Sequence, residues 1–232
     1  MPAILPAWTE ADPELHARLA AAIDPDRKVL QALERIAPLS GKRIADVGTG
    51  IGHYPMLLAP RTGRTYGVES DPALLAEARR LAAETHQPNI RIVEGDAVSL
   101  PLRDGAVDFV LSAEIAPDDT SLPAIAEAMR VLRPGGRLIA IGYYGRDDVA
   151  PLLDPETVAR AMEATHRRTG WWLRNGFKIK VVHSRVDLSD TELAHELLPR
   201  LYGDRGRAYL MAPHGASLRL NLGLFHRAVP ER

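Results

Sequence analysis

The chain has 232 residues, 46% of them hydrophobic and 25% charged, which is the composition of an ordinary globular protein with a well-buried core. Its 29 Lys and Arg nearly balance 30 Asp and Glu, so no overall positive field gathers phosphates and nucleic acid is disfavoured as the main partner. The lack of cysteine excludes disulfides, zinc–thiolate sites and cysteine nucleophiles. Without a signal-peptide pattern or a membrane-spanning apolar run, we expect a cytoplasmic protein.

The first 40 residues have a helical pattern. Residues 12–23 are rich in Ala and Leu, and Asp24-Pro25 predicts the capped start of a second helix. That helix has one apolar stripe, formed by Val29, Leu30, Leu33, Ile36 and Ala37. We expect these helices either to cover a ligand as a lid, with Trp8 and His16, or to pack on the core.

From residue 41 onward, short apolar runs alternate with helical stretches. Strands are expected at 43–47, 65–69, 90–94, 107–112 and 137–142, and helices at 51–59, 72–86 and 122–132. Such alternation builds a mostly parallel, doubly wound sheet with helices on both faces.

The last third predicts a closing antiparallel pair of strands around a helical insertion. A helix is expected from Asp154-Pro155 to about residue 169, and strands at 177–187 and 217–228. Ser189 and Glu192 predict a capping box for a helix reaching about residue 201. With no repeat or linker, we expect one α/β domain over 1–232: a helical extension at 1–40, a ligand-binding core at 41–145, and sheet-closing and acceptor-side elements at 146–232.

The strongest motif is the turn after the first strand, Asp46-Val47-Gly48-Thr49-Gly50-Ile51-Gly52. Glycine permits positive φ and lets a ligand approach the backbone closely. A nucleotide-dependent oxidoreductase would show G-x-G-x-x-G, whereas this turn is G-x-G-x-G, so that class is disfavoured. A tight turn without a ligand is the structural alternative.

Two further strands end in acidic residues. Glu69 lies 19 positions after Gly50, at the tip of the second strand, where a carboxylate can accept hydrogen bonds from a ribose diol. Asp96 follows the third strand and could accept from an exocyclic amino group, while the Ala97 amide donates to a ring nitrogen. Taken singly, Glu69 could be a surface acid and Asp96 could cap a turn. Asp108 and the Pro134-Gly135-Gly136 reversal are expected to be structural.

Taken together, these elements resemble the class I S-adenosylmethionine-dependent methyltransferases, in particular the ubiquinone/menaquinone-biosynthesis group, over residues 42–143. The resemblance implies a seven-stranded sheet with an antiparallel last strand and S-adenosyl-L-methionine as cofactor. It also implies cofactor-binding residues: Asp46, Gly48, Thr49, Gly50 and Gly52 around the methionine part, Glu69 and Ser70 at the ribose, Asp96 and Ala97 at the adenine, and Ser112 where the fourth strand opens onto the cofactor.

The expected reaction is in-line methyl transfer to a small molecule that the sequence does not identify. The protein holds acceptor, methyl and sulfur collinear and dry, and only an alcohol or carbon acid needs a base. Acceptor-side candidates are His53, Glu114 and Tyr143, with Asp118, Asp119 and Tyr144 as weaker ones. Many relatives carry His or aromatic residues after the fourth strand, but residues 113–119 here read Ala-Glu-Ile-Ala-Pro-Asp-Asp, so a relative's acceptor does not transfer.

Other functions stay open at this stage. Arg167, Arg168, Arg174, Lys178 and Lys180 flank Trp171 and Trp172, a pattern that suits RNA in a modifying enzyme but is more typical of a solvated surface. Protein methylation, a non-catalytic cofactor-binding protein and, less favoured, an oxidoreductase are the remaining alternatives. The histidines share no ligand spacing, so no metal is expected. The sequence does not distinguish a monomer from a homodimer.

Overall fold

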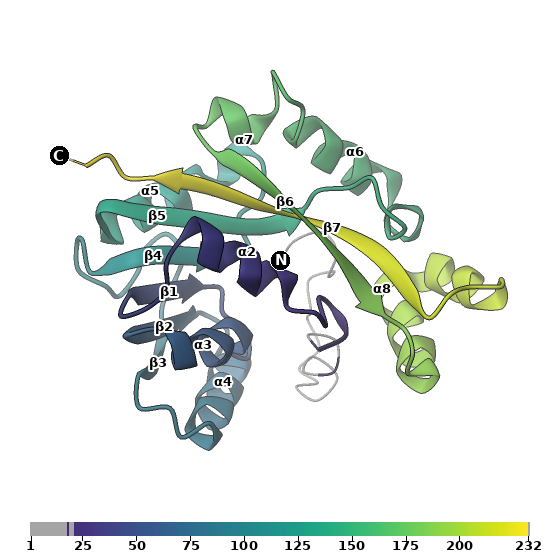
Figure 1. Cartoon of the computed structure of the whole chain (residues 1–232), viewed down its shortest axis with the longest axis horizontal. Helices are drawn as coiled ribbons and strands as arrows, with labels where there is room; N and C mark the ends of the chain where they lie inside the picture. Colours follow the sequence, from purple (N-terminus) through teal and green to yellow (C-terminus); the bar gives the residue numbers. More distant parts are fainter. Residues whose placement is uncertain (1–17, 19–20, 232) are drawn as a thin grey trace.

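A seven-stranded sheet forms the centre of the computed structural model, which describes residue 18 and residues 21–231 (Figure 1). Its strands are β1 (Arg43–Val47), β2 (Arg64–Glu69), β3 (Ile90–Glu94), β4 (Val107–Ser112), β5 (Leu132–Tyr143), β6 (Lys178–Asp187) and β7 (Ser217–Ala228). They lie in the order β3-β2-β1-β4-β5-β7-β6. Strand β7 runs antiparallel to β5 and β6 on its two sides, and the other pairs are parallel. The expected doubly wound sheet with an antiparallel last strand is confirmed.

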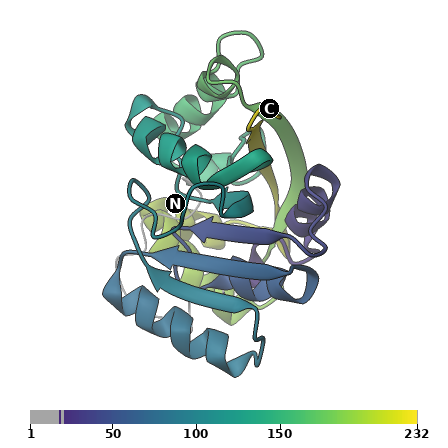
Figure 2. The same ribbon diagram turned by 90° about the vertical axis from the view of Figure 1, so that its left-hand side faces the viewer.

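Helices cover both faces of the sheet (Figures 1 and 2). They are α2 (Lys28–Ile36), α3 (His53–Leu58), α4 (Pro72–Glu84), α5 (Leu122–Val131), α6 (Pro155–Ala164), α7 (Trp171–Arg174) and α8 (Thr191–Met211). Residues alternate between the faces of a strand, so Ile139 and Ile141 of β5 pack in one core cluster and Leu138 and Ala140 in another. The first cluster includes α2 and α3, and the second includes α5 and α7.

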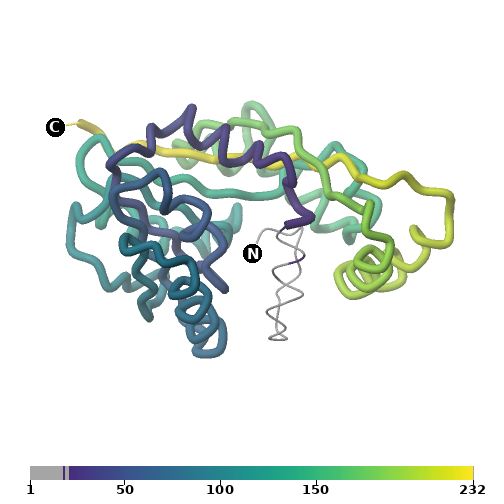
Figure 3. Tube along the Cα trace, turned by 60° about the horizontal axis from the view of Figure 1, so that its bottom comes forward, coloured from purple at the N-terminus to yellow at the C-terminus, as the bar shows by residue number. Residues whose placement is uncertain are grey.

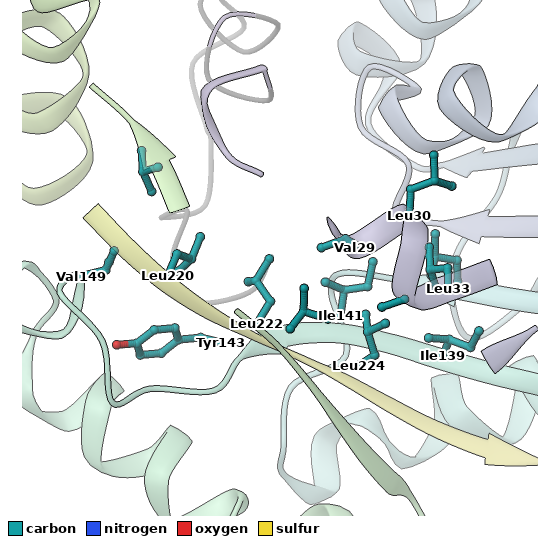
Figure 4. Close-up of a cluster of buried hydrophobic side chains, with 14 of the residues drawn as sticks. Val29, Leu30, Leu33, Ile139, Ile141, Tyr143, Val149, Leu220, Leu222 and Leu224 are labelled. Carbon is teal, nitrogen blue, oxygen red and sulfur yellow. The ribbon is translucent and has the colours of Figure 1, made fainter. Parts of the chain in front are cut away.

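The first core cluster is built mainly from aliphatic side chains of α2, β5 and β7 (Figure 4). Val29, Leu30 and Leu33 of the predicted stripe are all buried there. Burying a side chain of this size contributes about 2 kcal/mol, so the stripe is what holds α2 on the sheet.

Several helix boundaries differ from the sequence-based expectation, most clearly in α2 and α8. Helix α2 begins at Lys28, because the Asp24 carboxylate accepts from the amides of Lys28 and Val29 rather than from residues directly after it. The cap of α8 is Asp190, whose Oδ1 accepts from the Leu193 amide, and not Ser189. This helix continues to Met211 across a kink at Gly203, where φ is 56°.

The helix predicted to reach residue 169 ends at Ala164, and a separate four-residue helix, α7, follows Gly170. Both tryptophans of α7 are buried. Trp172 stacks on Phe225 with ring centroids 4.0 Å apart, and the Trp171 indole N–H donates to Asp119 over 2.9 Å. These rings are therefore unavailable for stacking on bases, and the five basic residues around them form an exposed surface.

Strand β5 begins at Leu132, five residues before the expected start. Its pairing with β4 is interrupted between Leu132 and Arg137, where Gly135 adopts a φ of 73°. The Pro-Gly-Gly reversal is thus an irregularity inside the strand, not a turn that precedes it.

Strands β6 and β7 extend past the end of β5 and carry α8 away from β1–β3 (Figures 1 and 3). Pairing of β5 with β7 stops at Tyr143 and Leu222, whereas β6 and β7 stay paired as far as Asp187 and Ser217. The molecule therefore has a compact parallel half and a projecting antiparallel arm.

Asp108 ties the start of β1 to the reversal in β5. It is 6% exposed, accepts from the Arg43 amide at 2.9 Å and from the Arg133 guanidinium at 2.6 Å, and pairs with Lys42. Burial alone would raise the pKa of this carboxyl, but those partners outweigh it and hold the pKa below its usual value.

We expect Asp108→Ala to lower the free energy of unfolding by about 2 kcal/mol, because a buried acceptor is lost while its basic partners remain partly exposed. Since the folded-state pKa is depressed, the stabilisation is present above the ordinary carboxyl pKa and is lost as pH falls below about 4. Urea unfolding at neutral and acidic pH measures both effects. Asp104→Ala, which removes an exposed partner of Arg130, is the matched control and should change little.

Candidate functional site

The glycine turn at the tip of β1 has the backbone that its sequence requires. Gly48, Gly50 and Gly52 have φ values of 72°, 57° and 85°, in the left-handed region that other residues rarely adopt. The amides of Gly48 and Thr49 donate to the Val68 carbonyl at 2.9 and 3.1 Å. The turn is thus braced against β2, and its position is set by the sheet.

Glu69 fastens the end of β2 to the same turn. It is 6% exposed, and its Oε2 accepts from the Gly50 amide at 2.8 Å. Its Oε1 accepts from the amides of Ser70 and Asp71, each at 2.9 Å. Each carboxylate oxygen has two acceptor positions, so Glu69 keeps capacity for one further donor, at Oε2. It is a buried acid of the turn and not a surface acid.

Asp46 lies beneath the turn and is 2% exposed. It accepts from the Thr49 hydroxyl at 2.6 Å. Burial raises the pKa of Asp46 to about 7; the Thr49 bond opposes the shift, and the charges of Glu114 and Glu69 add to it. This carboxyl therefore titrates near neutral pH.

Glu114, two residues after β4, reaches across to the glycine turn. A Cβ atom on Gly48 would lie 2.2 Å from its Oε2, so the carboxylate is in direct contact with the Gly48 backbone. The Glu114 amide donates to the Ser112 hydroxyl at 3.2 Å. Glu114 is exposed at the mouth of the site, yet partial desolvation raises the pKa of its carboxyl and the charge of Glu69 adds to the effect.

Three carboxylates therefore meet at one turn. In the described part of the chain, no Lys or Arg side chain forms an ion pair with Asp46, Glu69 or Glu114. A cluster of carboxylates with no basic ion-pair partner among the described residues attracts a ligand that carries positive charge.

A pocket of about 480 Å³, counting the space that opens to solvent, lies beside this cluster. Its lining includes Val47, Ala97, Leu100, Ser112, Glu114 and Ala128. Asp96 lies on an exposed turn before Ala97, and its Oδ1 accepts from the Val98 amide at 2.8 Å. The structure thus brings Ala97, Ser112 and Glu114 together at the pocket. Asp96 caps a turn, which was the structural alternative named for it in the sequence analysis.

The other two acceptor-side candidates, His53 and Tyr143, lie in different parts of the structure. His53 begins α3 directly after Gly52, and its ring packs edge to face on Tyr54 at 5.3 Å. Tyr143 is 5% exposed in the first core cluster (Figure 4). Its hydroxyl donates to Asp147 at 2.8 Å. Burial and that bond raise the pKa of Tyr143, so it remains a neutral packing residue.

Some residues of the site were not expected from the sequence. Ala124 and Ala128, four apart on α5, place a small-residue face against the pocket, and Ser121 and Ile115 complete it. Helical spacing of two alanines is a signal that sequence reasoning can use. The tether from Trp171 to Asp119 joins segments distant in the chain and leaves no local signal.

Two absences concern the described residues only. No cluster of three or more His, Asp or Glu side chains among them has the geometry to hold a metal ion. None of their helices is long and apolar enough to cross a membrane.

Residues 44–136 match the family model described as "Methyltransferase domain". A relative from Mycobacterium ulcerans, a probable phthiotriol/phenolphthiotriol dimycocerosates methyltransferase, is 31% identical over 216 residues, which is 88% of this chain and 78% of the relative. The demethylmenaquinone methyltransferase of Thermus thermophilus is 39% identical over 50% of this chain and 52% of its own length.

Solved structures share the fold. YcgJ of Bacillus subtilis has a TM-score of 0.61 at 18% identity and covers 89% of this chain and 100% of its own. The [4+2]-cyclase SpnF has a TM-score of 0.58 at 21% identity. These two structures and two further similar ones each cover 87–94% of this chain. The cyclase shows that this fold alone does not determine the reaction.

The fold and the acid-lined glycine turn define an S-adenosylmethionine-binding α/β protein. The chain belongs to the class I S-adenosylmethionine-dependent methyltransferases. The residues present fit that cofactor: three carboxylates suit its net positive charge, and Glu69 retains one acceptor position for a hydroxyl group.

We expect Asp46→Asn to stabilise the ligand-free protein. The folded-state pKa of about 7 lies above the unfolded value of 3.8, so the wild type loses stability as pH rises between these values, and Asn does not. The asparagine oxygen can still accept from Thr49. Thermal unfolding should show a variant melting temperature higher by about 5 °C at pH 8 and by less at pH 5. An equal difference at both pH values would contradict the assigned titration.

We expect Tyr143→Phe to lower stability by about 1 kcal/mol, because the Asp147 carboxylate loses a buried donor. Cofactor affinity should stay within twofold, since the hydroxyl serves the core and not the glycine turn. Denaturant unfolding and calorimetry on the same preparations check the two parts separately. A loss of activity at unchanged stability would instead place Tyr143 in the chemistry.

Proposed function

We propose that this methyltransferase acts on a lipophilic small-molecule acceptor by in-line methyl transfer. The observation that carries the proposal is the acid-lined glycine turn of β1 opening beside a pocket with mostly apolar walls. The relatives named for dimycocerosates and for demethylmenaquinone act on large apolar acceptors, which supports the same acceptor class here.

The proposed cofactor contacts follow from the geometry. The amides and glycines of residues 48–52 would lie along the methionine part, with Asp46 and Thr49 beneath it. Glu69 and Ser70 would hold the ribose, and Asp96, Ala97 and Ser112 would border the adenine and the pocket. When bound, the cofactor supplies an electrophilic methyl group on a positively charged sulfur.

The chain's own contribution is to orient the acceptor and exclude water. Apolar pocket residues such as Val110 and Leu100 keep the site dry, which strengthens electrostatic interactions there. An acceptor hydroxyl would need a group to take its proton, and His53 beside Gly52 and Glu114 against Gly48 are the candidates nearest the turn. Tyr143, bonded to Asp147, is the weakest of the three.

We also propose a division of labour within one domain. Residues 41–145 would hold the cofactor, and residues 146–232 would shape the acceptor side and close the sheet. Residues 1–17 and 19–20, with Trp8 and His16 of the expected lid, lie outside the described residues. Arg18 does pair with Glu196 of α8 at 3.1 Å, and Ala22 packs with Leu193 and Leu197.

A cofactor-binding protein without methyl transfer is the second candidate, favoured by the sequence of residues 113–119 and by the cyclase that shares this fold. Product analysis separates the two. The protein, S-adenosylmethionine and a panel of lipophilic phenols, alcohols and quinones should yield an acceptor whose mass has grown by one methylene. Tight cofactor binding with no methylated product across that panel would favour the second candidate.

We expect Glu69→Gln to weaken S-adenosylmethionine binding at least tenfold in calorimetry. The amide keeps the size of the side chain but has one acceptor oxygen, which must then serve the turn amides and the ribose together. Glu94→Gln is the matched control, because Glu94 ends the neighbouring strand β3 and is exposed. Equal affinities for the two variants would contradict the role given to Glu69.

A further inference from the structure

The three carboxylates at the glycine turn differ in how the protein uses them. Glu69 binds three backbone amides and Asp46 binds the Thr49 hydroxyl, so both acids hold the turn together. No described residue donates a hydrogen bond to the Glu114 carboxylate. Glu114 therefore adds negative charge to the site without serving the architecture of the turn.

The position of Glu114 depends on Gly48. Any side chain at residue 48 would overlap the Glu114 carboxylate and lie 2.7 Å from its Cγ, so the missing Cβ makes room for this side chain. The backbone of Glu114 is itself held, because its amide bonds to Ser112, which is 3% exposed at the end of β4. A charged group that follows β4 thus lies against the glycine turn that follows β1.

We infer that Glu114 sets the preference of the site for the positively charged methyl donor over its neutral, demethylated product. The inference rests on the proposed function. S-adenosylmethionine carries one more positive charge than S-adenosylhomocysteine and otherwise presents nearly the same groups. A carboxylate in partly desolvated surroundings attracts that extra charge and gains little from the product.

The charge change occurs in the reaction itself. The bond between methyl carbon and sulfur breaks with its electron pair left on sulfur, while a lone pair of the acceptor forms the new bond to carbon. The sulfur becomes neutral, and the acceptor's proton passes to a base or to solvent. Glu114 then faces a ligand that no longer compensates its charge, which favours product release and limits product inhibition.

Calorimetry with three ligands tests this inference. For wild type and Glu114→Gln we would measure the affinities of S-adenosylmethionine, S-adenosylhomocysteine and sinefungin, in which a protonated amine replaces the methylated sulfur. The substitution should weaken both charged ligands about tenfold and the neutral product less than threefold, so the ratio of donor to product affinity falls. Glu114→Asp keeps the charge and should recover part of the ratio.

The outcomes separate this inference from the proposed function. An unchanged ratio in Glu114→Gln, with all ligands still bound, would overturn the inference and leave the proposed function standing. If wild type binds neither donor nor product, the proposed function fails first. Wild type alone offers a second measurement, because added salt should weaken the charged ligands more than the product. Equal salt dependence would also overturn the inference.

Discussion

The structure depends on one constraint: crowded carboxylates must be held around a turn whose backbone strongly favours glycine. The charged form of Asp46 is strongly disfavoured, since burial raises the pKa of this carboxyl to about 7 and its neighbours are also acidic. A fold selected for stability alone would not place three acids there. In the proposed function a cationic ligand would relieve this unfavourable charge, so stability and function would oppose each other at this turn.

The sheet makes this arrangement possible through its strand order. The order reverses between β1 and β4, and ligands of open α/β sheets bind at such a switch point. Asp46 and Glu69 come from β1 and β2 on one side of it, and Ser112 delivers Glu114 from β4 on the other. Because the carboxyl ends of these parallel strands share one edge, short connections suffice to bring all three acids together.

The predictions from the sequence were most accurate where a local residue pattern determines the secondary structure. Strands β1, β3, β4 and β7 were predicted at their observed bounds, because apolar runs flanked by turn residues specify them. Helix ends were less accurate, since caps act at a distance, as Asp24 does for α2. The contact of Glu114 with Gly48 and the bond from Tyr143 to Asp147 are tertiary contacts that follow from the fold, so their consequences were beyond the sequence.

The match to the family model, residues 44–136, coincides with the compact parallel half and ends before the projecting arm of β6, β7 and α8. A physical reason follows from the two ligands. The methyltransferase family shares its methyl donor, so the turn, its glycines and its acids are constrained to one geometry, whereas the relatives are named for different acceptors. Asp119, in segment 113–121, accepts a hydrogen bond from the Trp171 indole and so joins that segment to α7. This agrees with the proposed division of labour, in which residues 146–232 shape the acceptor side and lie outside the part that the family model matches.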